Sequence, residues 1–134
     1  MAFMKWDDSF SVNVAEIDQQ HMKLFDMINE FYEAQRADNH LALGHLLDSL
    51  IDYTKFHFSA EEIYFDRFHY GAAEEHKKIH QQFIGKVGDA KRRYDDGGFV
   101  ISLEITNYLK DWLVAHIKGT DRLYSVFFNQ NGLI

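Results

Sequence analysis

The sequence contains neither cysteine nor proline. Without cysteine, the chain cannot form disulfides, thiolate metal sites or iron–sulfur clusters. Without proline, no residue of that kind interrupts a long helix. Runs of lysine and arginine are also missing, and the formal net charge is -7. This charge balance argues against nucleic acid or an anionic membrane surface as a partner.

Long apolar runs and targeting signals are absent as well. No apolar stretch approaches the roughly 18 residues that would indicate a membrane span. The first residues lack a basic region followed by an apolar stretch, so no export signal is visible and a cytoplasmic location is expected. The 134 residues are 46% hydrophobic and 26% charged, which is ordinary for a soluble domain. We expect residues 1–134 to form a single domain.

Helical periodicity dominates the chain. Apolar residues recur at spacings of three and four over residues 21–32, 43–65, 76–94 and 101–116. Asp18 is expected to cap the first helix, and the polar stretch 36–40 to end or follow it. The second helix is expected to stop before Tyr70-Gly71, and Asp95-Asp96-Gly97-Gly98 predicts a loop.

Four amphipathic helices joined by short loops favour one fold class. We predict an all-α, antiparallel up-down-up-down four-helix bundle. The residues before about 18 would form an N-terminal arm, and those after about 121 a short C-terminal element.

Six polar residues lie on the predicted apolar faces. Two pairs have the i,i+4 spacing, which places their Cβ atoms roughly 6 Å apart on one helix face. The residues are His21, His57, Glu61, His76, His80 and His116. Burying a polar group without a partner costs roughly 2–7 kcal/mol. Coordination of a metal would satisfy all six groups at once.

The ligand types narrow the choice of metal. Imidazole and carboxylate without thiolate suit iron, zinc, copper or nickel. Six groups exceed the four that a zinc site usually takes, whereas two ions sharing bridging carboxylates would use them all. Lys77 stands where a zinc protease has its glutamate, and the Glu-x-x-His pattern of ferritin-like di-iron proteins is absent from the sequence.

Asp121 is a further candidate ligand. It follows His116 by five residues, a spacing that points away from His116 on a regular helix. A π-type turn, or a helix end at Gly119, would bring the carboxylate back toward the site.

The series His21, His57-x-x-x-Glu61, His76-x-x-x-His80 and His116-x-x-x-x-Asp121 resembles the ligand signature of the hemerythrin family, in particular its bacterial single-domain members. The resemblance covers essentially the whole chain. It implies two non-haem iron ions, one held by His76, His80 and His116 and the other by His21 and His57. Glu61, Asp121 and an oxo or hydroxo group would bridge them. Dioxygen would bind as a hydroperoxide at the iron with an open position, each iron giving one electron.

A water-excluding pocket is expected beside the open iron. Helix facing and the resemblance together suggest its lining: Leu24, Phe25, Trp112, Leu113 and Ile117. His40, His45 and His69 lie off the inward stripes and are expected to face solvent. Glu62, at i+5 from His57, is expected to point away from the pair of ligands.

Several functions are compatible with such a centre. The leading hypothesis is a non-enzymatic carrier, store or delivery protein for dioxygen, because every inward polar residue is a plausible ligand. The second hypothesis is sensing of oxygen, redox state or nitric oxide through a separate partner protein. An oxygen-consuming protein is a further candidate partner, which would receive the delivered gas. Turnover of peroxide or nitric oxide ranks third. A structural bundle loaded with zinc or manganese is the remaining alternative.

Overall fold

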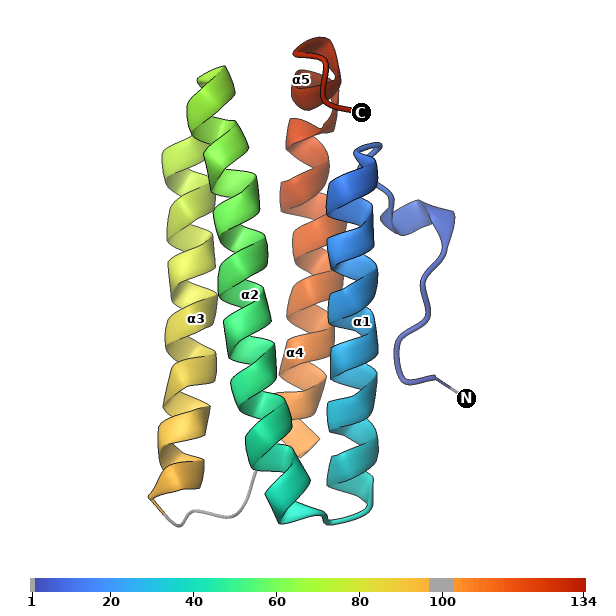
Figure 1. Cartoon of the computed structure of the whole chain (residues 1–134), viewed down its shortest axis with the longest axis vertical. Helices are drawn as coiled ribbons and strands as arrows, with labels where there is room; N and C mark the ends of the chain where they lie inside the picture. Colours follow the sequence, from blue (N-terminus) through green and yellow to red (C-terminus); the bar gives the residue numbers. More distant parts are fainter. Residues whose placement is uncertain (1, 97–102) are drawn as a thin grey trace.

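Four helices run side by side and alternate in direction in the computed structural model of the chain, which describes residues 2–96 and 103–134 (Figure 1). They are α1 (Ala15–Arg36), α2 (His40–Phe68), α3 (Ala73–Asp95) and α4 (Leu103–Ala115). None of the described residues lies in a β-strand. The predicted up-down-up-down bundle is therefore confirmed. Of the predicted loop Asp95-Asp96-Gly97-Gly98, Asp95 is the last residue of α3, and Gly97 and Gly98 lie outside the described residues.

The starts of α1 and α2 differ in how they are capped. Asn39 caps α2, because its side chain accepts a hydrogen bond from the backbone N–H of Ala42 at 3.2 Å. The prediction for Asp18 is wrong, since α1 already begins at Ala15. The Asp18 carboxylate instead accepts hydrogen bonds from the backbone N–H of Val12 at 2.9 Å and from the Ser11 hydroxyl at 2.6 Å.

The fourth helix does not end cleanly. It continues into a π-helical turn (His116–Thr120), a 3-10 turn (Asp121–Tyr124) and the short helix α5 (Ser125–Gln130). The backbone N–H of Asp121 reaches the carbonyl of His116, five residues back, which confirms the predicted π-type distortion. A Cβ added at Gly119 would meet nothing within 4 Å, so the turn does not need glycine for space.

An N-terminal arm, residues 2–14, passes beside α1 (Figure 1). Three side chains from the C-terminal segment donate hydrogen bonds to its carbonyls. Arg122 reaches Ser9, the Ser125 hydroxyl reaches Val12 at 2.6 Å, and Asn129 reaches Asn13 at 2.9 Å. The arm is thereby held against the end of the bundle that contains the π-helical turn.

The inward faces of the helices form a largely apolar interior. Its buried hydrophobic residues come from the arm, from all four long helices and from α5. No helix among the described residues is both long and apolar enough to cross a membrane. Because the interior is dry and tightly packed, any polar side chain within it must find a partner there.

Candidate metal centre

The bundle brings the seven side chains of the predicted ligand series to one place. None of them is more than 4% exposed. The helices α1, α2 and α3 contribute five of them, His116 begins the π-helical turn that follows α4, and Asp121 begins the 3-10 turn after it. The cluster lies toward the end of the bundle where α1 and α3 begin and α2 and α4 end.

The candidate ligands form two overlapping groups, and within each group the ligand atoms lie within 4.8 Å of one another. One group comprises Glu61, His76, His80, His116 and Asp121. The other comprises His21, His57, Glu61 and Asp121. The two carboxylates belong to both groups, so they lie between three histidines on one side and two on the other.

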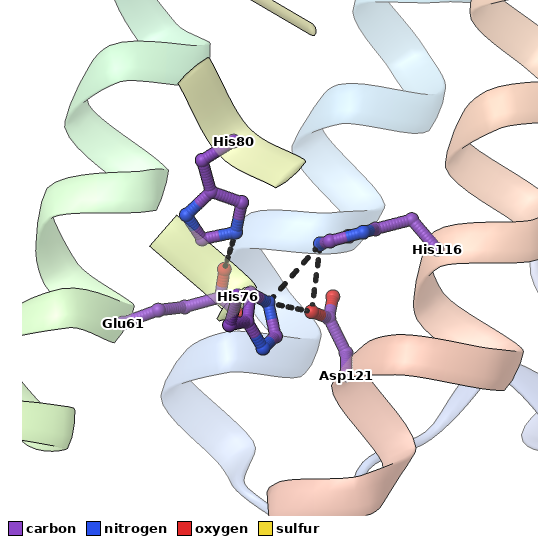
Figure 2. A group of neighbouring side chains, drawn as sticks. All are labelled: Glu61, His76, His80, His116 and Asp121. Carbon is purple, nitrogen blue, oxygen red and sulfur yellow. Dashed lines mark hydrogen bonds and ion pairs between the residues drawn. The ribbon is translucent and has the colours of Figure 1, made fainter. Parts of the chain in front are cut away.

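Figure 2 shows the side with three histidines. The Nε2 atoms of His76 and His116 each lie 2.9 Å from Oδ1 of Asp121 and 3.3 Å from each other. His80 Nε2 lies 3.3 Å from Oε1 of Glu61. Two imidazole nitrogens can share a hydrogen bond only if one is protonated, whereas a cation would accept both lone pairs.

The side with two histidines has the same character. His21 Nε2 lies 3.1 Å from Oδ2 of Asp121, and His57 Nε2 lies 3.4 Å from Oε1 of Glu61. The two oxygens of Asp121 thus face different histidines on opposite sides. This is the arrangement of a carboxylate that bridges two positions.

Unsatisfied polar atoms provide a test of whether these residues fit a metal. Eight buried side-chain nitrogen and oxygen atoms of the described residues have no hydrogen-bond partner, and all belong to the seven clustered side chains. They are both ring nitrogens of His21, Nε2 of His57 and His80, Nδ1 of His116, Oε1 of Glu61 and both carboxylate oxygens of Asp121. Each such atom costs about 1–3 kcal/mol in an apolar interior. Most of them face the shared space, so the donor set fits bound cations.

The electrostatics favour the ligand forms of His57, His80 and Asp121, whereas the pKa of His116 is raised by Asp121 and Glu61 against the opposing effect of burial. Burial lowers the pKa of His57 and of His80 to about 4, so both rings are neutral with a free lone pair at neutral pH. Burial alone would raise the pKa of Asp121, but the charge of His116 and the close approach of the His21 and His76 rings hold it well below its usual value. Asp121 is therefore a carboxylate.

Three further residues hold the clustered side chains from behind. Gln20 Oε1 lies 2.6 Å from Nδ1 of His57, and Glu62 Oε2 lies 2.9 Å from Nδ1 of His80. The buried Tyr124 hydroxyl donates a hydrogen bond to Oε2 of Glu61. Burial and the nearby carboxylates raise the pKa of Tyr124 well above its usual value, so it remains a donor.

Sequence reasoning did not assign a role to any of these three residues. Glu62 does lie outside the cluster, as expected, but it contacts the back of His80 on a neighbouring helix. The available signal was position: Gln20 precedes His21 and Glu62 follows Glu61, which places both on the flanks of inward helix faces. His40, His45 and His69 are exposed, as predicted.

A small apolar cavity adjoins the cluster. It is lined by Leu24, Ile28, Leu50, Thr54, Phe58, Phe83, Trp112 and Leu113. The centre of a water-sized molecule can move within about 10 Å³ of this cavity, which is close to the minimum that one such molecule needs. The only polar lining residue, Thr54, donates its hydroxyl hydrogen to the carbonyl of Leu50 at 2.6 Å.

Two residues of the cavity wall also stack on histidine rings of the cluster. Phe58 stacks on His80 with ring centroids 3.7 Å apart, and Trp112 stacks on His116 at 4.3 Å. Of the five residues expected at the pocket, Leu24, Trp112 and Leu113 line this cavity. Phe25 and Ile117 are buried but do not contribute to its wall.

Known proteins resemble this chain along most of its length. A family model described as the hemerythrin HHE cation-binding domain matches residues 12–126. Bacteriohemerythrin of Stenotrophomonas maltophilia is 34% identical over 125 residues, 93% of this chain and 81% of that protein. Bacteriohemerythrin of Methylococcus capsulatus is 34% identical over 92% of this chain and 95% of its own length. A crystal structure of wild-type hemerythrin superposes with a TM-score of 0.89 and 34% identity, covering 92% of this chain and 96% of that one.

Proposed function

Since the chain belongs to the hemerythrin family, we propose that it binds dioxygen reversibly at two non-haem iron ions held by the seven clustered side chains. The observation that carries this proposal is the pair of overlapping ligand groups that share Glu61 and Asp121. One ion would have three histidines and the other two. The ion with fewer histidines would keep an open position for the gas.

The resemblance implies that the two ferrous ions would supply one electron each and a bridging hydroxo group one proton, so that the gas would be held at the level of a hydroperoxide. The remaining work belongs to the chain itself. Leu24, Leu113 and the other apolar residues of the cavity would admit a small uncharged molecule while keeping bulk water out. Exclusion of water slows the loss of reduced oxygen species, which keeps binding reversible. Nitric oxide has a similar size and belongs to the same proposal as a second ligand.

We propose a carrier, store or delivery protein rather than an enzyme. The buried polar side chains at the centre are the candidate ligands and the residues that hydrogen-bond to them from behind. None of these is left over as an acid or base for turnover.

The test is to load the metal-free protein with ferrous iron under nitrogen and to count iron per chain. Spectra recorded before air, after air and after degassing then follow the gas. We expect two irons per chain and charge-transfer bands that appear with air and vanish on degassing. One iron per chain, or bands that persist after degassing, would contradict the proposal.

A matched pair of variants makes the test specific to the centre. Asp121→Asn removes the charge of a shared carboxylate at nearly constant shape, and we expect it to lower the iron content below two. Asp111→Asn makes the same change at an exposed position of α4 and should leave the iron content unchanged.

A further inference from the structure

On each side of the centre, one histidine has a hydrogen-bond partner on its outer nitrogen, Nδ1. The two partners differ in charge. Behind His57 stands the neutral amide of Gln20, with Oε1 at 2.6 Å from Nδ1. Behind His80 stands the carboxylate of Glu62, with Oε2 at 2.9 Å from Nδ1. Both acceptors lie within hydrogen-bond distance of a ring Nδ1, but one acceptor is neutral and the other is charged.

Both contacts fix which ring nitrogen faces the centre. A carboxylate or amide oxygen can only accept, so Nδ1 of each ring carries the hydrogen and Nε2 keeps its lone pair. The Nε2 atoms of His57 and His80 are the ones that face Glu61, at 3.4 Å and 3.3 Å. Phe58 stacks on the His80 ring with an interplanar angle of 3°, which holds that ring in place.

The charge of the acceptor changes the strength of the ligand. A hydrogen bond to a carboxylate is roughly twice as strong as one to a neutral oxygen. It also draws the Nδ1 hydrogen away from the ring, which makes Nε2 more basic and a better donor to a cation. The His80 ring is 1% exposed and the Glu62 side chain 24%, so solvent weakens this effect only in part.

We propose that Glu62 and Gln20 make the two metal positions electronically unequal. Glu62 strengthens His80 and so favours the higher oxidation state at the side with three histidines. Gln20 leaves His57 a weaker donor, so the side with two histidines holds its ion more loosely. This inference rests on the proposed function for the identity of the ions, and it assigns positioning residues for that same site.

Isosteric exchanges test the charge while they keep the hydrogen bond. Glu62→Gln, Gln20→Glu and the double exchange are titrated with Co²⁺ against a competing chelator. We expect Glu62→Gln to weaken one of the two Co²⁺ ions by about 10- to 100-fold and to leave the other unchanged. Gln20→Glu should tighten the other ion. The double exchange should narrow the difference between the two affinities.

The reduction potential of the iron-loaded protein gives a second measurement. Glu62→Gln should raise the midpoint potential, because the lost charge had favoured the ferric state. A tenfold selective loss of affinity for Fe³⁺ corresponds to a rise of about 59 mV. Glu30→Gln, at an exposed position of α1, is the matched control and should leave the affinities and the potential unchanged.

The outcomes separate charge from simple positioning. Glu62→Ala loses both the charge and the acceptor. If Glu62→Gln behaves as the unchanged protein while Glu62→Ala binds weakly, the inference is overturned, because only the hydrogen bond matters. Gln20→Glu places a charge in the interior. If the Gln20→Glu variant does not fold, the result for Glu62→Gln alone tests the inference. An unchanged protein that holds fewer than two Co²⁺ ions would instead overturn the proposed function.

Discussion

Removal of the metal should cost this protein a large part of its folding free energy. Six of the buried atoms that lack hydrogen-bond partners face the shared space, and without a cation each would cost about 1–3 kcal/mol, together about 6–18 kcal/mol. A protein of this size has a total stability of about 5–15 kcal/mol. The metal-free chain therefore cannot keep all of these atoms buried without a partner.

We expect a loss of at least about 5 kcal/mol, because water entering the loosened centre recovers the rest. At about 3–4 °C per kcal/mol, the unfolding midpoint should fall by about 15–20 °C. The assay is thermal unfolding followed by circular dichroism, on the iron-loaded protein, on the chelator-treated protein and after iron is restored. Restored iron should return the midpoint to its first value.

Two variants identify the origin of the shift. His45→Ala removes an exposed histidine outside the centre and should leave the metal-dependent increment intact. His57→Ala removes a buried candidate ligand and should abolish most of it. If the chelator-treated protein unfolds within a few degrees of the loaded protein, the buried atoms do not depend on metal and the reasoning fails.

Three further predictions concern the metal-free stability, two glycines and the cavity. Because the pKa values of His57 and His80 are about 4 in the fold and 6.5 in the unfolded chain, the unfolded state binds more protons between those values. The free energy of unfolding of the metal-free protein should therefore fall by up to about 3 kcal/mol per histidine as the pH falls from 6.5 to 4. The raised pKa of His116 offsets part of this loss. Urea unfolding at pH 7 and at pH 4.5 measures the difference. Gly85→Ala should stabilise the protein by about 0.5–1 kcal/mol, since a Cβ there meets nothing within 4 Å. Gly44→Ala should destabilise it, because its Cβ would lie 2.7 Å from the Tyr94 ring. Equal unfolding midpoints in urea for the two variants would contradict both predictions. Phe58→Ala should cost about 3–5 kcal/mol and speed oxidation of the iron by air, while Phe56→Ala, 58% exposed, should change neither the urea midpoint nor the oxidation rate.

The helices and the distortion at the centre could be read from the sequence because both follow from local spacing. Apolar residues at three and four predict the helix faces, and a five-residue gap between His116 and Asp121 predicts a π-type turn. The cap at Asp18 was predicted wrongly because aspartate competes for any nearby donor. The arm offers Val12 and Ser11, and the helix begins one turn earlier.

The residues behind the candidate ligands could not be read in this way. Gln20 and Glu62 each contact a histidine on another helix, so their roles depend on how far each helix is rotated about its axis. The wall of the cavity depends on the same rotations. Phe25, for example, packs against Trp6 and Phe10 of the arm at 5.4 Å and 4.8 Å between ring centroids.

The order in which the seven clustered side chains leave the ribosome has a consequence for how the centre is filled. A nascent chain that has released α1 to α3 already presents five of them, but the carboxylate of Asp121, which belongs to both groups, is still missing. Arg122, Ser125 and Asn129, which fasten the arm over this end of the bundle, emerge later still. Cation capture would thus wait until the segment after α4 has been synthesised, and a ribosome stalled before it would expose histidines that the rest of the bundle does not yet cover.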